Sequence, residues 1–402
     1  LSLAFLSGLG ILISGIISFE QFSQVSLEDA FNGMVTITNL TAFWQLFLSA
    51  VTLIVLSMCV FREKKQSSLE FYSLIIGILL GVHVLVMSSN FLMLYFSLEL
   101  VSLSSYAITF FAFNKQPSES SLKYLLFGAA ASAIMLYGLS LLFAITGTLD
   151  FTGQAFIDNM LAANPIPVIV ASILVLSGFL FKISAFPFHL WVPDVYETAP
   201  TPVVAYFSVV PKIGGIAILI KVVLTLNLFG QAPINWGILL AVLSMLTIAV
   251  GNLSALFQFN IKRLLAYSAI AQTGFMLAGL AAFSETSLVN VIFYSCIYTV
   301  AGIGAFMIVH FFERRHGKME ISSLAGVVNS YPYLSILLLV MMVSLTGLPP
   351  TAGFTAKFLI FSSIWESYTY NNNGWLLALL AFGLVITVVA LFYYLKIPYY
   401  MI

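Results

Sequence analysis

The sequence has very few charged residues. Of its 402 residues, 7% are Asp, Glu, Lys or Arg and 61% are hydrophobic, whereas a soluble domain carries about 25% charged residues. This scarcity excludes an ordinary soluble protein, and the formal net charge of zero gives no basis for a nucleic-acid partner. The composition is typical of an integral membrane protein.

Cysteine and histidine are too few and too dispersed for a redox or metal site. Cys59 and Cys296 stand alone in separate apolar runs, and the 4 histidines lack a second ligand at metal-binding spacing. The sequence also lacks a glycine-rich phosphate loop and a CxxCH haem-attachment motif. We therefore expect no cofactor and no metal on this chain.

Long apolar runs recur along nearly the whole chain. A membrane-spanning helix needs about 20 such residues, and its backbone groups must be hydrogen-bonded within the segment. The runs predict an all-α, polytopic membrane protein with about 12 transmembrane helices. The run 331–368 is too long for one crossing and contains SLTGLPPTAGFTAKF, so we predict one span broken at Pro349 and Pro350.

Charge in the predicted loops indicates how the chain is oriented. If each run crosses once, one side of the membrane receives all the loop lysines and arginines, and the other side receives only acidic residues. The basic side is expected to face the cytoplasm, the mitochondrial matrix or the chloroplast stroma. The basic loop residues are Arg62, Lys64, Lys65, Lys115, Lys262, Arg263, Arg314, Arg315, Lys318 and Lys396.

Some charged residues fall inside apolar runs, where each costs about 2.5–3.5 kcal/mol near the bilayer centre. Glu99 lies in the middle of its run. Lys182 precedes Pro187 by five residues, Lys212 directly follows Pro211, and Lys357 follows Pro350 by seven residues, so each lies beside a predicted helix break. Carbonyls freed at a helix break, and water that enters there, stabilise an ammonium group. These residues are candidates for proton transfer, and a static ion pair is the alternative for Glu99.

Three other polar residues in or near the runs are harder to interpret. Lys123 is close enough to a loop to extend its ammonium into water, so a functional and an interfacial role are both open. Lys221 is expected to reach the interface on the acidic side. His189 follows Pro187 and has a side chain suited to relaying protons, because its unperturbed pKa is about 6.5.

The two proline-containing breaks have the same layout. In each, a long apolar helix meets a break, at Pro187 and at Pro349, with a lysine beside it. Pairs of interrupted helices are typical of transporters built from inverted repeats. We predict flanking helices in residues 1–68, a first five-helix repeat in 69–226 and a second in 235–397.

Four stretches of the sequence resemble a known family. They are similar to the antiporter-like membrane subunits of proton-pumping NADH:quinone oxidoreductase, respiratory complex I. The VPDVYE form and the lysine at 357 resemble the subunit N branch, which has mitochondrial and plastid counterparts, while the KRLLAYS element is shared with Mrp antiporters. The stretches are LELVSLSSYA (98–107), FPFHLWVPDVYETAPTPV (186–203), NIKRLLAYSAIAQTGF (260–275) and SLTGLPPTAGFTAKF (344–358).

The resemblance implies a fold of about 14 helices with two inverted five-helix repeats, so one flanking helix is expected to be missing at each end of this chain. It implies proton-transfer roles for Glu99, Lys182, Lys212 and Lys357, and a modulating role for Lys123. NADH, FMN, iron–sulfur clusters and quinone are implied in partner subunits. The implied location is a bacterial inner, mitochondrial inner or thylakoid membrane.

We therefore expect a proton-translocating membrane subunit that couples electron transfer in other subunits to proton pumping. Its partners would be the other membrane subunits, especially neighbouring antiporter-like ones, and the lipid bilayer. Two alternatives stay open: a stand-alone or Mrp-type cation/proton antiporter subunit, and a structural subunit that does not conduct.

Overall fold

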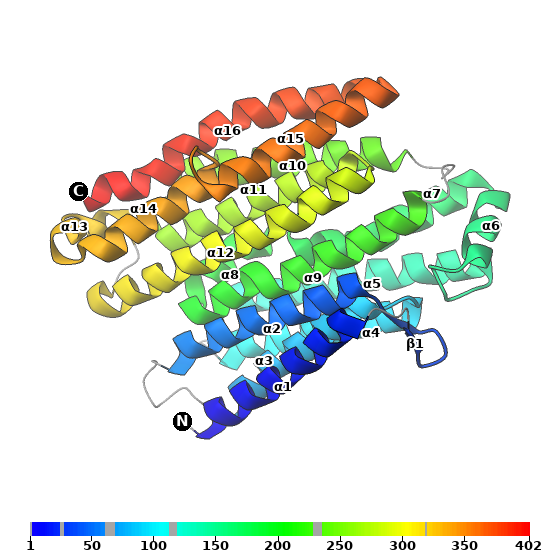
Figure 1. Ribbon diagram of the computed structural model, residues 1–402, viewed down its shortest axis with the longest axis horizontal. Helices are drawn as coiled ribbons and strands as arrows, with labels where there is room; N and C mark the ends of the chain where they lie inside the picture. The colour runs from blue at the N-terminus through cyan, green and yellow to red at the C-terminus, as the bar shows by residue number, and fades with distance from the viewer. Residues whose placement is uncertain (1, 25–27, 61–68, 112–118, 228–234, 318–319) are drawn as a thin grey trace. The chain divides into compact units, whose positions relative to one another are not determined.

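The computed structural model describes residues 2–24, 28–60, 69–111, 119–227, 235–317 and 320–402. Nearly all of these residues are helical, and the strands among them form one short hairpin (Figure 1). The predicted all-α fold class is confirmed. Of the predicted basic loop residues, several lie outside the described residues: Arg62, Lys64, Lys65, Lys115 and Lys318.

The first half of the chain consists mostly of long apolar helices. Because apolar side chains surround these helices on all sides, they suit burial or contact with lipid. In chain order, the elements are α1 (Ser2–Gln24), β1 (Glu28–Ala30), β2 (Val35–Ile37), α2 (Asn39–Val60), α3 (Leu69–Met87), α4 (Phe91–Phe111), α5 (Glu119–Thr146), α6 (Gln154–Ala162), α7 (Pro165–Ile183), α8 (Trp191–Thr198) and α9 (Thr201–Asn227).

The second half continues in the same manner and ends on a long helix. Its elements are α10 (Trp236–Leu256), α11 (Ile261–Ala281), α12 (Glu285–His316), the short 3-10 helix η1 (Ile321–Leu324), α13 (Val327–Ser330), α14 (Pro332–Thr346), α15 (Ala352–Asn371) and α16 (Gly374–Met401).

The described residues contain 11 helices that are long and apolar enough to cross a membrane. The predicted run 331–368 is occupied by α14 and α15, which are separated at residues 347–351. The broken helix predicted there is confirmed. Eleven helices and one broken helix together agree with the prediction of about 12 spans.

Both halves of the chain show the same order of helices. The series α3, α4, α5, α7–α8 and α9 corresponds to α10, α11, α12, α14–α15 and α16, and the fourth helix of each series is broken. This order agrees with five-helix segments in 69–226 and 235–397. The assignment of these segments as repeats stays a prediction.

By its contacts the chain divides into two compact units. Unit 1 comprises Leu1–Ile183 and Val210–Ile234, and unit 2 comprises Ser184–Val209 and Asn235–Ile402. The segment after the first break, with α8 and the beginning of α9, therefore groups with the second half of the chain.

Glycines allow close helix packing inside each unit. In unit 1, a Cβ atom added to Gly138 of α5 would lie 2.7 Å from the backbone nitrogen of Val175 in α7. In unit 2, a Cβ atom added to Gly274 of α11 would lie 2.6 Å from Cγ1 of Ile248 in α10. Small residues at such contacts let membrane helices approach closely, and the close approach increases the van der Waals attraction between them.

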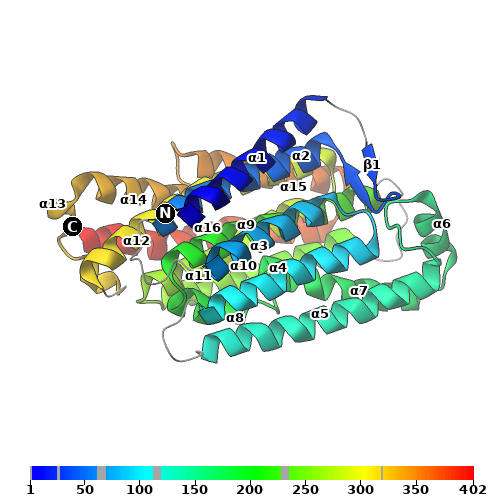
Figure 2. The same cartoon turned by 90° about the horizontal axis from the view of Figure 1, so that it is seen from below.

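A β-hairpin occupies part of the interval between the first two helices, which the sequence indicated only as polar. Its strands pair antiparallel, and Val35 forms a further bridge to Ser88 after α3. The hydroxyl of Ser89 donates a 2.6 Å hydrogen bond to the carbonyl of Gly33. The hairpin therefore lies against the turn between α3 and α4, and Figure 2 shows it beside one end of α1 and α2.

Replacing Gly138 with Val should destabilise unit 1, because the added atoms would meet the α7 backbone. Overpacking costs about 1–3 kcal/mol or more. Thermal unfolding of the purified protein in detergent would show the loss. The control is Gly10→Val in α1, where nothing lies within 4 Å of an added Cβ; equal melting temperatures for the two variants would contradict the expectation.

Candidate functional site

The first break places Lys182 in the last turn of α7, one residue before the helix ends. Ser184, just beyond, has a φ of 62°, and a cis peptide joins Phe186 to Pro187. Proline cannot supply a backbone N–H to continue the helix, so α7 stops and α8 begins only at Trp191.

Lys182 is buried, with 4% of its surface exposed, and its contacts lie within unit 1. Its Nζ donates a 2.9 Å hydrogen bond to the hydroxyl of Ser102 in α4, one helical turn from Glu99. The carboxylate of Glu99 attracts this ammonium electrostatically. Among the described residues, Oε1 of Glu99 is buried with no hydrogen-bond partner, so Ser102 is the group in direct contact with Lys182.

Sequence analysis did not select Ser102 as a functional residue. The available signal was its spacing of three residues from Glu99, which places both side chains on one face of α4.

Lys212 is also in unit 1, in α9 directly after Pro211, and is 2% exposed. Gly215, one turn further along α9, lies so close to α7 that an added Cβ would be 2.6 Å from Ile183 and 3.5 Å from Cγ of Lys182. The structure thus brings three predicted residues, Glu99, Lys182 and Lys212, into one part of unit 1, where α4, α7 and α9 meet.

Lys357 borders the second break, in unit 2, and is 4% exposed. Its Nζ donates a 2.8 Å hydrogen bond to the carbonyl of Thr346, the last residue of α14, and lies 4.4 Å from the ring centre of Phe275. Gly347 follows with a φ of 85°, and a Cβ there would lie 2.7 Å from Cδ of Lys357. Glycine is needed at 347 for its left-handed backbone and for the lysine stem beside it.

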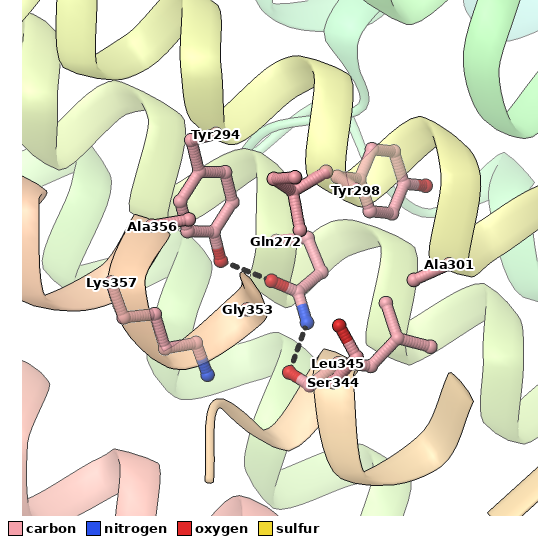
Figure 3. A pocket seen from close by; sticks show the side chains of 10 residues that line it. Gln272, Tyr294, Tyr298, Ala301, Ser344, Leu345, Gly353, Ala356 and Lys357 are labelled. Atoms are coloured by element: carbon pink, nitrogen blue, oxygen red, sulfur yellow. Dashed lines mark hydrogen bonds between the residues drawn. The ribbon is translucent and has the colours of Figure 1, made fainter. Parts of the chain in front are cut away.

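A small cavity of about 10 Å³ lies next to Lys357. Figure 3 shows the lysine side chain, Gln272 and Tyr294 arranged around it. Its walls come from α11, α12, α14 and α15, and its lining includes Tyr298 and Ser344. The cavity is mostly apolar, and the amide, hydroxyl and ammonium groups in its lining supply hydrogen-bond partners for about one water molecule.

Lys123 and His189 have contacts of a different kind. The Lys123 ammonium, whose side chain is 41% exposed, pairs at 2.8 Å with Glu119 in the first turn of α5. His189 lies between α7 and α8 in unit 2 and stacks on Phe186, with ring centres 5.9 Å apart. The modulating role of Lys123 and the relay role of His189 stay predictions.

Five basic residues that the sequence placed in loops lie in helices instead: Lys262, Arg263, Arg314, Arg315 and Lys396. Among these, Lys262 is buried. It lies in the first turn of α11 and is 4% exposed. Its Nζ donates a 2.8 Å hydrogen bond to the carbonyl of Ala199 and pairs at 3.3 Å with Glu313, which also accepts a hydrogen bond from Thr201. These contacts bury Lys262 because α11 and α12 pack around the end of α8.

Arg263, the next residue of α11, forms ion pairs with the short helix α8. Its Nη1 lies 3.2 Å from Oδ1 of Asp194 and 2.7 Å from Oε2 of Glu197. The two acidic residues of α8 therefore anchor the segment after the first break.

The expectations for two other lysines also change. Lys396 lies inside α16, where its Nζ donates to the carbonyl of Gln258, so it is not in a loop. Lys221 does more than extend to the interface: its Nζ donates hydrogen bonds to the carbonyl of Ser88 at 2.6 Å and the hydroxyl of Thr36 at 2.7 Å.

The fold and these side chains define a class: a polytopic helical membrane protein with buried lysines beside two helix breaks. The transmembrane family described as NADH:quinone oxidoreductase/Mrp antiporter matches residues 88–387, and the chain belongs to this family. The resemblance drawn from the sequence motifs is therefore confirmed.

Individual relatives extend over most of the chain. It is 36% identical to NAD(P)H-quinone oxidoreductase subunit 2 of Synechocystis sp. over 406 residues, covering 99% of this chain and 75% of that protein. It is 41% identical to NADH-quinone oxidoreductase subunit N 2 of Sorangium cellulosum over 345 residues, covering 83% and 67%.

Two solved structures share the fold. A chain of respiratory complex I from Thermus thermophilus with bound aureothin matches with a TM-score of 0.82 and 29% identity, covering 100% of this chain and 84% of that one. A chain of the Mrp complex from Dietzia sp. matches with a TM-score of 0.84 and 20% identity, covering 98% and 74%.

Replacing Glu313 with Gln should destabilise unit 2, because it leaves the buried ammonium of Lys262 without its anion. Breaking a buried pair costs about 3 kcal/mol or more. The double variant Lys262→Met with Glu313→Leu should lose less. Unfolding in detergent measures both, and Glu119→Gln in the exposed pair with Lys123, expected to change stability by less than about 1 kcal/mol, is the control.

Acid should destabilise the protein through His189, which lies outside the candidate spans. Burial lowers the pKa of His189 from its ordinary value of 6.5. Below about pH 6.5, the unfolded chain binds a proton at this residue more readily than the folded protein does. The contribution of neutral His189 to the free energy of unfolding is therefore complete above that pH and decreases as the pH falls below it. His189→Gln should flatten the melting temperature between pH 7 and 5; an unchanged pH dependence would contradict this.

Proposed function

We propose that this chain is an antiporter-like, proton-translocating membrane subunit of an NADH:quinone oxidoreductase, and so part of an enzyme without carrying its redox centres. The observation that supports this most directly is the burial of Lys182 and Lys357 at the two helix breaks and of Lys212 directly after Pro211 in α9. Static packing alone gives no reason to bury three ammonium groups in one membrane protein, and Glu99 attracts one of them, that of Lys182. The names of the relatives point to the same function.

In the proposed mechanism, the proton is carried by lysines in the order Lys182, Lys212 and Lys357. While Glu99 attracts the Lys182 ammonium, the charged form of the lysine is favoured. Moving the carboxylate away would weaken that attraction and release the proton onward. Ser102, hydrogen-bonded to Lys182, is positioned to hold the lysine in either state.

The proton gradient opposes this transfer, so the chain needs an outside source of energy. Moving one charge against 100 mV costs about 2.3 kcal/mol. We propose that quinone reduction in partner subunits, which would hold NADH, FMN and iron–sulfur clusters, supplies it. The direct partners would be other membrane subunits, including neighbouring antiporter-like ones, in a bacterial inner, mitochondrial inner or thylakoid membrane with the basic loops inside.

The finer assignments from the sequence complete the proposal. Residues 69–226 and 235–397 would be inverted repeats flanked by 1–68, with breaks at Pro187 and at Pro349 and Pro350. Lys123 would modulate the Glu99–Lys182 pair, and His189 would assist proton uptake.

Two alternative functions each have an observation in their favour. The shared fold of the Mrp complex chain favours an Mrp-type cation/proton antiporter subunit. The fixed hydrogen bonds of Lys221 and Lys262 favour a non-conducting structural subunit.

Replacing Lys212 with Met in the assembled complex should lower proton translocation per electron by about tenfold or more. Proton uptake by vesicles and quinone reduction are measured together. Lys212→Arg keeps the charge and tests whether charge alone suffices, and Arg314→Met, at the exposed end of α12, is the control. Normal pumping by an intact Lys212→Met complex would exclude the relay, while failure to assemble would favour the structural subunit.

A further inference from the structure

Gln272 is a hydrogen-bonding centre in unit 2. Its Nε2 donates to the carbonyl of Leu345 at 2.8 Å and to the hydroxyl of Tyr394 at 2.9 Å. Its Oε1 accepts a hydrogen bond from Tyr294. One buried side chain, 2% exposed, thereby joins α11 to α12, α14 and α16.

The amide of Gln272 borders the cavity that also contains Lys357 (Figure 3). The titratable groups that face this cavity are Tyr294 and Tyr298 of α12, with Tyr394 of α16 behind the amide. No acidic residue is among the described residues that line the cavity. The oxygen in contact with the Lys357 ammonium is the Thr346 carbonyl, which is neutral.

In the first half of the chain, a carboxylate acts on the lysine at the break, whereas Gln272 stands in α11 at the position that Ser102 has in α4. Glu99 lies in α4, the second helix of its series, and acts on Lys182 at the broken fourth helix. Gln272 lies in α11, the second helix of the other series, and shares a cavity with Lys357 beside the other break. In the second half, the cavity beside the lysine is thus bordered by an amide that has the shape of glutamate but no charge.

The presence or absence of a carboxylate determines how strongly the charged form of a buried lysine is favoured. A buried ammonium loses hydration, and an adjacent carboxylate restores part of the lost free energy by Coulomb attraction. A carbonyl dipole and an aromatic face, such as Thr346 and Phe275 provide, compensate less. Lys357 thus has partners for brief charging, and the described residues that line its cavity include no anion to retain the proton.

We propose that Gln272 is a positioning residue that keeps the second half free of a counter-ion, so that Lys357 releases its proton instead of holding it. This inference rests on the proposed function, since it assumes that Lys357 carries protons. The amide also orients Tyr294 and Tyr394 around the cavity, which fixes where water sits beside the lysine.

The test is Gln272→Glu in the assembled complex, a nearly isosteric change that introduces an anion beside Lys357. Proton translocation at pH 7 should fall about tenfold, and the pH at which pumping is half-maximal should change by about one unit or more to the alkaline side, because the anion holds the ammonium. Gln258→Glu, at the loop between α10 and α11, adds the same charge away from the cavity and is the control.

Gln272→Met separates charge from packing. It removes the hydrogen bonds while the cavity stays uncharged, so it should lower the rate and leave the pH profile where it is in the unmodified complex. If Met and Glu change the profile equally, the role of Gln272 is structural and the inference is wrong. The Met variant alone decides the matter if the Glu variant does not assemble, because an alkaline change there would also overturn the inference.

Lys357→Met separates this inference from the proposed function. Normal pumping by that variant would remove Lys357 as a carrier and the proposed function with it. Loss of pumping in Lys357→Met, together with an unchanged rate and pH profile in Gln272→Glu, would overturn only the inference about Gln272.

Discussion

An ammonium group buried among apolar helices needs an oxygen atom to replace its lost water, and this need shapes the interior of the chain. In both units the acceptors are often the last carbonyls of helices, which lack intrahelical donors and lie at the negative end of the helix dipole. The pairs are Lys221 with Met87 and Ser88 at the end of α3, Lys262 with Ala199 after α8, and Lys357 with Thr346 at the end of α14. Helix ends inside the protein thus serve as cation sites.

Lys182 follows a different pattern, and this gives the two halves different chemistry. Its contact is the hydroxyl of Ser102, with the charge of Glu99 nearby. A hydroxyl both donates and accepts hydrogen bonds. The electrostatic attraction between a carboxylate and the lysine changes when the carboxylate moves. Lys357 has a fixed carbonyl instead. Similar backbones with a break in the fourth helix can therefore hold a proton in one half and pass it on in the other.

Local signals in the sequence predicted the class of fold, both breaks and the candidate lysines. These signals are apolar runs, prolines and charges inside a run, and each one determines the local structure at its own position in the sequence. The burial of Lys262 could not be predicted in this way, because it depends on Ala199 and Glu313, which are 63 and 51 residues away. The contact of Ser102 with Lys182, across 80 residues, depends on packing for the same reason.

The direction of these contacts along the chain has a consequence for biosynthesis. Lys182, Lys221 and Lys357 donate to oxygens that precede them, by 80, 133 and 11 residues. Lys262 donates both to Ala199, 63 residues before it, and to Glu313, 51 residues after it. A protein is made from its N-terminus, so the acceptor already exists when each lysine leaves the ribosome. The spans can then enter the lipid in sequence order, with Lys182, Lys221 and Lys357 joining a bundle that already contains their oxygen partners, while Lys262 gains its anion only when α12 follows.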